Sequence, residues 1–229
     1  PIRRYIDEVG APPGRMRIGF ATTKFTGEAI HPDCVEAVEK TAKLLDSLGH
    51  HVEPTFPAAL NDPKAAARFS ALWATNMATT RDGLANILGR PVTENDVELM
   101  NWVMAEFAKN LSAVDYANAL NAAGMFRRNV AQWWADGWDL LLTPTVSSPP
   151  LPVGMSRNNP ADPNETGRIS VDWIPFTSQF NTTGQPAISL PMHWNQAGLP
   201  VGIQLVAAYG REDILIRIAA ELEASAPWD

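Results

Sequence analysis

The sequence predicts an α/β protein with a block of helices inserted near residues 63–135. The first sixty residues are patterned as strand, helix and strand, and short apolar strands return after residue 138 before a final helix. The block between them is rich in Ala, Met, Trp and Asn and carries no strand signal. Strands that alternate with helices are typical of folds in which helices cover a sheet. With 229 residues, 45% of them hydrophobic, the chain can bury a sizeable core.

Residues 1–60 are predicted to form a βαβ unit. Residues 15–20 alternate towards apolar side chains and predict a strand, and residues 51–56 predict a second one. Between them a helix is expected from Pro32, a residue that suits a first helical turn, to Gly49, which suits a helix end.

Residues 63–135 are expected to contain three or four helices, near 64–87, 94–109 and 113–135. Thr93 with Asp96, and Ser112 with Asp115, place a hydroxyl three residues ahead of an acid, which is the spacing of a capping box at a helix start.

Residues 138–229 predict strands and a closing helix. Their expected parts are a buried strand at 138–142, an irregular loop at 147–170, a helix and turn from 176, strands at 187–191 and 201–207, and a helix at 212–224.

Composition excludes several classes of function. A net charge of −7 disfavours nucleic acid as a partner, because nucleic-acid surfaces concentrate Lys and Arg. No apolar run is long enough to span a membrane. Cys34 is the only cysteine, which excludes an intrachain disulfide and favours a reducing, cytoplasmic location. The chain opens at Pro1 without an initiator Met, so we expect it to start within a longer protein.

Familiar catalytic groups are not assembled in this sequence. Ser147 and Ser148 form the only serine pair, but they run into two prolines rather than a glycine-lined turn. No histidine pair has metal-ligand spacing, and His31 is expected to cap a helix. The five lysines have polar or loop surroundings, unlike a buried catalytic lysine. We therefore expect no catalytic residue on this chain, no metal and no cofactor.

Two groups of side chains are candidates for a substrate pocket. Phe69, Trp73 and Asn76 share one face of a predicted helix, and an amide among aromatic rings suits recognition of an amide. Aromatic side chains at helical spacing also occur in ordinary cores. Thr177 and Asn181 are four residues apart on another predicted helix, next to the turn Gly184-Gln-Pro. Asn181 could border a site, satisfy free backbone groups at that turn, or do both.

Four motifs carry a resemblance to a known family: Asp139-Leu-Leu-Leu-Thr-Pro-Thr145, the run from Phe176 to Pro191, Gly198-Leu-Pro-Val-Gly-Ile-Gln204 and Gly210-Arg-Glu-Asp213. In this order and spacing they resemble the C-terminal half of amidase signature hydrolases, over nearly the whole chain. The resemblance implies a single portion of an amidase domain over residues 1–229, with a mixed sheet flanked by helices; its parts are the βαβ unit at 1–60, the helical block at 63–135 and the strands and closing helix at 138–229.

The resemblance also implies an activity. Family members cleave the C–N bond of carboxylic amides through a serine acyl-enzyme, with a second serine in a cis peptide and a lysine base. These residues belong to a Gly-Gly-Ser-Ser stretch and its surroundings, which this sequence lacks. The implied partners are a small amide substrate and the N-terminal half of the same fold. The implied pocket residues are Trp73, Asn76, Phe176, Thr177 and Asn181.

Ile174 indicates the kind of amide. The A subunit of glutamyl-tRNA amidotransferases is expected to carry an acid here, three residues before Thr177, to hold an ammonium group. An apolar side chain favours instead the general bacterial amidases and 6-aminohexanoate cyclic dimer hydrolases, which this sequence resembles more closely. The alternative is a catalytically inactive binding or scaffold subunit, and exposed sheet edges would favour self-association into a homo-oligomer. A nucleotide-binding domain is disfavoured, because no glycine-rich phosphate motif is present.

Overall fold

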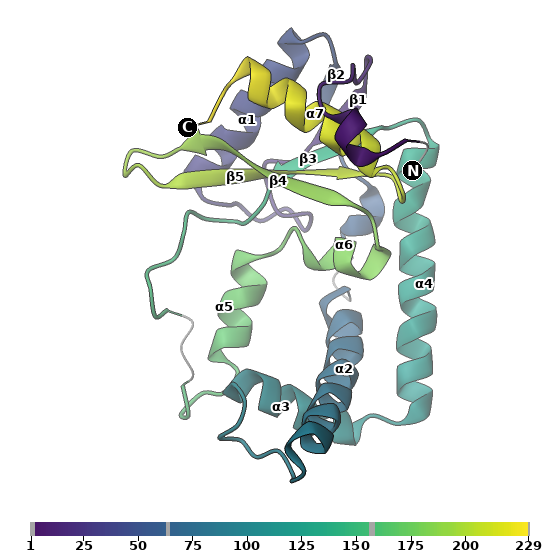
Figure 1. The fold of residues 1–229 in the computed structure, drawn as a ribbon, viewed down its shortest axis with the longest axis vertical. Coiled ribbons are helices and arrows are strands. Elements are labelled where there is room, and N and C mark those ends of the chain that lie inside the picture. The colour runs from purple at the N-terminus through teal and green to yellow at the C-terminus, as the bar shows by residue number, and fades with distance from the viewer. Residues whose placement is uncertain (1–2, 63–64, 156–158, 229) are drawn as a thin grey trace. The chain divides into compact units, whose positions relative to one another are not determined.

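A five-stranded mixed sheet organises the protein (Figure 1). The computed structural model describes residues 3–62, 65–155 and 159–228. The strand order is β2-β1-β3-β5-β4; β1 runs parallel to β2 and to β3, whereas β5 is antiparallel to both of its neighbours. The strands are β1 (Arg17–Phe20), β2 (His51–Pro54), β3 (Leu140–Pro144), β4 (Ala187–Trp194) and β5 (Pro200–Ala207). The predicted α/β class with a mixed sheet is confirmed.

Two helices, α1 (Pro32–Ser47) and α7 (Glu212–Ser225), lie on the same side of this sheet (Figure 1). They bury one continuous apolar core with the strands, because each helix presents a stripe of apolar side chains and each strand an apolar face. Its fully buried members include Ile18, Leu45, Leu142, Ile203, Leu205 and Ile218.

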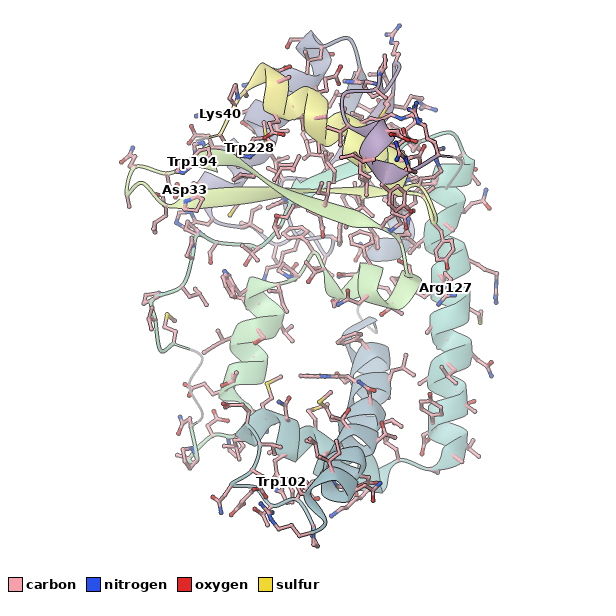
Figure 2. The ribbon with its side chains drawn as sticks, viewed as in Figure 1. Asp33, Lys40, Trp102, Arg127, Trp194 and Trp228 are labelled. Atoms are coloured by element: carbon pink, nitrogen blue, oxygen red, sulfur yellow. The ribbon has the colours of Figure 1, made fainter. Side chains whose placement is uncertain are left out.

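The ends of α1 follow from its sequence. Nδ1 of His31 accepts a hydrogen bond from the Asp33 backbone N–H at 3.2 Å, so His31 is the predicted cap, and Pro32 occupies the first turn. Gly49, with φ of +97°, follows the last turn. Oδ2 of Asp33 also accepts from Nδ2 of Asn195 at 3.0 Å, which ties the β4–β5 hairpin to α1. Asp33 and Trp194, the residue before Asn195, are labelled in Figure 2.

The chain divides into two compact units, residues 1–62, 127–151 and 174–229, and residues 63–126 and 152–173. The first contains the sheet. The second contains helices α2 (Ala65–Leu88), α3 (Leu99–Phe107) and α5 (Glu165–Trp173) and the first part of α4 (Ala113–Ala135). An ion pair joins Nη1 of Arg81 to Oε1 of Glu106 at 2.9 Å and links α2 to α3. Within the described ranges, no helix has the length and apolar character needed to cross a membrane.

The two predicted capping boxes have different outcomes. The Ser112 hydroxyl accepts from the Asp115 N–H and the Asp115 carboxylate accepts from the Ser112 N–H, so this box starts α4 as expected. The prediction of a helix from residue 94 is wrong, because α3 begins at Leu99. Oδ2 of Asp96 accepts from the N–H and the hydroxyl of Thr93 and from the Arg90 guanidinium, so the same residues close a turn.

The predicted irregular loop at 147–170 is wrong at its end, where α5 begins at Glu165. Its sequence, with Thr166, Gly167 and Ile169, has weak helix propensity. A contact with a residue ahead of the helix offsets this weak propensity: the carboxylate of Asp162, which precedes α5, pairs with the guanidinium of Arg168 within it. The helix is thus accompanied by a polar contact to a residue ahead of it, although local propensity does not predict a helix here.

A buried carboxylate fixes the N-terminal segment to α7. Glu8, which is 3% exposed, accepts hydrogen bonds from the guanidinium of Arg3 at 2.7 and 2.6 Å and from Nε of Arg217 at 2.7 Å. These hydrogen bonds lower the pKa of Glu8 from 4.5 to about 2. Folding therefore favours the ionised form of this side chain.

We expect Glu8→Gln to be less stable than the wild-type chain at pH 7 and to lose this disadvantage in acid. Because the folded pKa of Glu8 lies below its ordinary value, its contribution is complete above pH 4.5 and disappears as the pH falls towards about 2. Urea midpoints between pH 7 and pH 2 measure this. Asp7→Asn, which breaks the exposed pair with Arg4, is the matched control and should change stability little. Parallel pH profiles of wild type and Glu8→Gln would contradict the assignment.

Candidate functional site

The face of the sheet that points away from α1 is polar near the end of β3. Leu140 and Leu142 of β3, and Ile203 and Leu205 of β5, belong to the core under α1 and α7. Because successive side chains alternate between faces, the residues between and beside them point to the opposite face. Near the end of β3 these residues are Thr143, Thr145, Gly202 and Gln204, and the apolar Leu141 and Val206 lie further along the same face.

Two hydroxyl groups meet on this face across a glycine. Oγ1 of Thr145 and Oγ of Ser189 on β4 lie 2.6 Å apart, within hydrogen-bond distance. Gly202 lies on β5 between them, and a Cβ at this position would be 3.0 Å from both hydroxyl oxygens. A side chain at residue 202 would therefore press on both hydroxyls of this pair.

Gln204 is the most buried amide of the face, at 5% exposure. Its Nε2 donates to Oγ1 of Thr143 at 3.1 Å and to the backbone carbonyl of Phe176 at 3.0 Å. The Thr143 hydroxyl in turn donates to the carbonyl of Pro144. Both amide hydrogens of Gln204 are therefore used, and they connect β5 to β3 and to the segment before helix α6 (Ser178–Thr183).

Phe176 anchors this segment from inside. Its side chain is fully buried, and its ring meets Phe25 edge to face with 5.4 Å between centroids. Phe25 also contacts Phe56, with 5.3 Å between centroids. Aromatic pairs of this geometry add to the stability that burial provides. The structure places the side chain of Phe176 in a core rather than on an accessible surface.

Thr177 and Asn181 lie on one side of α6, as the spacing predicts, because the Asn181 N–H donates to the Thr177 carbonyl at 3.2 Å. Asn181 is exposed, and among the described residues its side-chain amide has no hydrogen-bond partner. Side chains other than Asn181 supply the hydrogen bonds at the turn that follows. The Thr183 hydroxyl donates to Oε1 of Gln185, and Nε2 of Gln185 donates to the Ala207 carbonyl. The amide of Asn181 is available to a ligand.

The other two predicted pocket residues belong to the helical unit. The rings of Phe69 and Trp73 are stacked on α2 with 6.3 Å between centroids. Trp73 is partly buried, whereas Asn76, one turn further along, is exposed. The five pocket candidates thus divide between the two units, with Trp73 and Asn76 in one and Phe176, Thr177 and Asn181 in the other.

Ser148, Lys40 and Lys109, which the sequence analysis excluded as catalytic groups, form hydrogen bonds or surface ion pairs of the usual kind. Ser148 donates to the carbonyl of Pro149, and Lys40 and Lys109 form surface ion pairs with Glu36 and Glu106. Lys64 lies outside the described residues. Burial raises the pKa of the Cys34 thiol to about 11, which disfavours a reactive thiolate.

His50 is also structural. It is 4% exposed, its Nδ1 accepts from the Met16 N–H, and its Nε2 lies 2.8 Å from Oε2 of Glu221. Among the described residues, no three or more His, Cys, Asp or Glu side chains are grouped so that they could hold a metal ion.

Comparison with known proteins identifies the family. The family model described as Amidase matches residues 1–216. The chain belongs to the amidase family. It is 35% identical over 232 aligned residues to 6-aminohexanoate-cyclic-dimer hydrolases of Paenarthrobacter ureafaciens and of a Pseudomonas strain, covering 99% of this chain and 47% of each relative. This amidase chain therefore spans about half the length of those curated relatives.

Solved structures agree with this assignment. The structure of 6-aminohexanoate cyclic dimer hydrolase superimposes with a TM-score of 0.93 and 35% identity, over 100% of this chain and 48% of that one. A bacterial aryl acylamidase of the amidase signature family superimposes with a TM-score of 0.74 at 17% identity, over 98% of this chain and 46% of that one, which shows a shared fold. The predicted resemblance to amidase signature hydrolases is confirmed.

Sequence reasoning did not select Gln204, although a signal was present. Gln204 is the only strongly polar side chain within the apolar stretch from Val201 to Val206. A polar group that is buried in such a strand is nearly always hydrogen-bonded, so it indicates a specific structural or functional partner.

Proposed function

We propose that this chain is the C-terminal part of an amidase that hydrolyses the C–N bond of carboxylic amides through a serine acyl-enzyme. In this proposal the nucleophile and the lysine base lie outside the 229 residues. The main support is the 35% identity to cyclic-dimer hydrolases, which extends over 99% of this chain. The surface ion pairs of Lys40 and Lys109 and the hydrogen bond from Ser148 to Pro149 agree with catalytic residues that lie outside this chain.

The contribution proposed for this chain is to bind and orient the substrate. Thr177, whose hydroxyl donates to the Ile174 carbonyl at 3.5 Å, and Asn181, whose amide has no partner among the described residues, lie on one side of α6. An amide side chain can both donate to a substrate carbonyl and accept from a substrate N–H. Phe176 supports them from the core. Trp73 and Asn76 of the helical unit are proposed as further substrate-binding residues, with the indole supplying apolar contact.

The proposed substrate class is a linear or cyclic amide without an ammonium group next to the scissile bond. Ile174, which is 37% exposed, precedes Thr177 by three residues and offers no counter-charge. An ammonium group left without an ionic partner in a desolvated site would be strongly disfavoured. This argues against an amidotransferase subunit that handles glutamine, and for apolar amides such as the cyclic dimer named for the relatives.

The test is complementation. The N-terminal half of the Paenarthrobacter cyclic-dimer hydrolase is co-expressed with this chain, and hydrolysis of 6-aminohexanoate cyclic dimer, an aryl amide and glutamine is measured. We expect turnover of the first two only. The same half with its nucleophilic serine replaced by alanine is the control and should give none. This chain alone should also be inactive; turnover by the purified 229-residue chain, abolished by changing one of its own serines, would contradict the proposal.

The proposal also covers the partner, the location and the assembly of the protein. We propose that the N-terminal half is the main partner, that the protein works in the cytoplasm, in line with its single buried Cys34, and that homo-oligomers are formed. A stable complex of the two halves without turnover of any amide would instead favour an inactive binding or scaffold subunit. Light scattering of the purified complex measures its subunit number.

A further inference from the structure

We propose that Gln204 is a positioning residue for the substrate-binding edge of α6. The inference rests on the proposed function, since it assigns Gln204 to the orientation of Thr177 and Asn181. Gln204 touches neither residue's side chain; it acts through the backbone carbonyl of Phe176, which accepts from its Nε2 at 3.0 Å. That carbonyl belongs to the peptide unit that enters Thr177, so the hydrogen bond sets the direction in which the helix starts.

Helix α6 needs such a constraint because it is short. It has six residues, Ser178–Thr183, and Thr177 at its start makes no side-chain capping hydrogen bond. Helices of this length have too few internal hydrogen bonds to offset the entropy of their own formation. Their geometry must therefore come from tertiary contacts, here the buried Phe180 and the hydrogen bonds at the two ends.

Both ends of α6 are attached to β5 by glutamine side chains. At the start, Gln204 of β5 donates to the Phe176 carbonyl. At the end, Nε2 of Gln185 donates to the carbonyl of Ala207, the last residue of β5, at 3.2 Å. On the outward side, Thr177 is partly buried and its hydroxyl donates to the Ile174 carbonyl at 3.5 Å, whereas Asn181 is exposed. Phe180 and Thr183 bury the inner side of the helix, and the two glutamine amides add directional hydrogen bonds that orient the outward polar groups.

The Gln204 amide is itself held rigidly. Its second hydrogen is donated to Oγ1 of Thr143, a residue with no exposed surface, and that hydroxyl donates onward to the carbonyl of Pro144. A side chain with both donors engaged and 5% exposure has little rotational freedom. Rigidity of this kind suits a binding edge, because polar groups that are held in place form hydrogen bonds to a substrate without first losing conformational freedom.

The test compares Gln204→Met, which keeps the side-chain length but removes both donors, with Thr41→Val. Thr41 is equally buried, and its hydroxyl donates to the Ala37 carbonyl within α1, away from α6. In the complemented enzyme, Gln204→Met is expected to raise KM about tenfold while kcat changes less than about threefold. Thr41→Val should leave both constants within about twofold. An unchanged KM for Gln204→Met would overturn the assignment.

A second readout does not depend on activity. Hydrogen exchange in the 229-residue chain reports on the Asn181 and Gly184 amides, which donate to Thr177 and Phe180. Gln204→Met should accelerate their exchange about tenfold and leave α1 unchanged. If the complemented wild type is inactive, the proposed function fails and this measurement alone decides the positioning role. Unchanged α6 exchange, or uniform acceleration across the sheet unit, would overturn it.

A double-mutant cycle then shows whether Gln204 acts through Asn181. Asn181→Ala is exposed and should fold normally. If Gln204 positions Asn181, the increase in KM for Gln204→Met combined with Asn181→Ala will be smaller than the product of the two single increases. Thr143→Val, which removes one of the two acceptors, serves as a milder variant should Gln204→Met fold poorly, and should give a smaller KM increase of the same kind. Strictly multiplicative effects would overturn the inference.

Discussion

Gly19→Ala is expected to destabilise the sheet-containing unit by about 3 kcal/mol, at the upper end of the usual cost of overpacking. Gly19 lies in β1 between Ile18 and Phe20. An alanine Cβ would come within 2.5 Å of the Thr55 backbone oxygen and 2.7 Å of the Trp133 ring. The clash with Thr55 involves a main-chain atom, which cannot move away by rotation about side-chain bonds. Trp133 is restrained as well, because its ring is stacked on Trp138 with 4.8 Å between centroids.

Urea unfolding followed by tryptophan fluorescence measures the effect of Gly19→Ala. Gly83→Ala is the matched control, since a Cβ at Gly83 of α2 would meet nothing within 4 Å. That substitution should be neutral or stabilise by about 0.5–1 kcal/mol, because alanine has the higher helix propensity. Equal stability of Gly19→Ala and the wild type would show that β1 and α4 can separate without cost, contrary to the packing described above.

Phe176→Ala is expected to destabilise the same unit by about 4 kcal/mol, as is typical for loss of a buried phenyl ring. Phe176 has no exposed surface and contacts Phe25 at 5.4 Å between centroids. Removing the ring leaves a cavity under the segment that leads into α6. We therefore expect loss of stability together with loss of substrate affinity in the complemented enzyme.

Two variants separate these effects of Phe176→Ala. Phe107→Ala is the control for stability: its ring is 45% exposed, so a change of less than about 1 kcal/mol is expected. Phe176→Leu should recover most of the stability, because it refills much of the space. If Phe176→Leu is stable yet loses substrate binding to the same extent as Phe176→Ala, the ring contacts the substrate and is more than an anchor.

The order of apolar and polar residues was sufficient to predict helices and strands whose side chains are buried at regular intervals. Pro32 and Gly49 marked the ends of α1, and the side chains of Val38, Ala42 and Leu45, which recur between them at helical spacing, are all buried. The same order of residues did not predict the structure correctly where hydrogen bonds of polar side chains determine it. Asp96 could start a helix or close a turn, and the nearby Arg90 selected the turn. At α5 the residues from Glu165 resembled a loop, because their helical state depends on contacts outside the helix, such as that of Arg168 with Asp162.

The sequence by itself determined that this protein is an α/β amidase-family chain and that Thr177 and Asn181 share one side of a short helix. Both follow from residue order and helical spacing, which are local properties. Only the tertiary structure decided that Phe176 is a core anchor and that Gln204 holds the carbonyl of Phe176. Gln204 reaches a residue 28 positions away and Thr143 61 positions away, and no local pattern encodes such pairs. They arise when β3, β5 and the segment before α6 bury their polar groups together and each donor must find an acceptor.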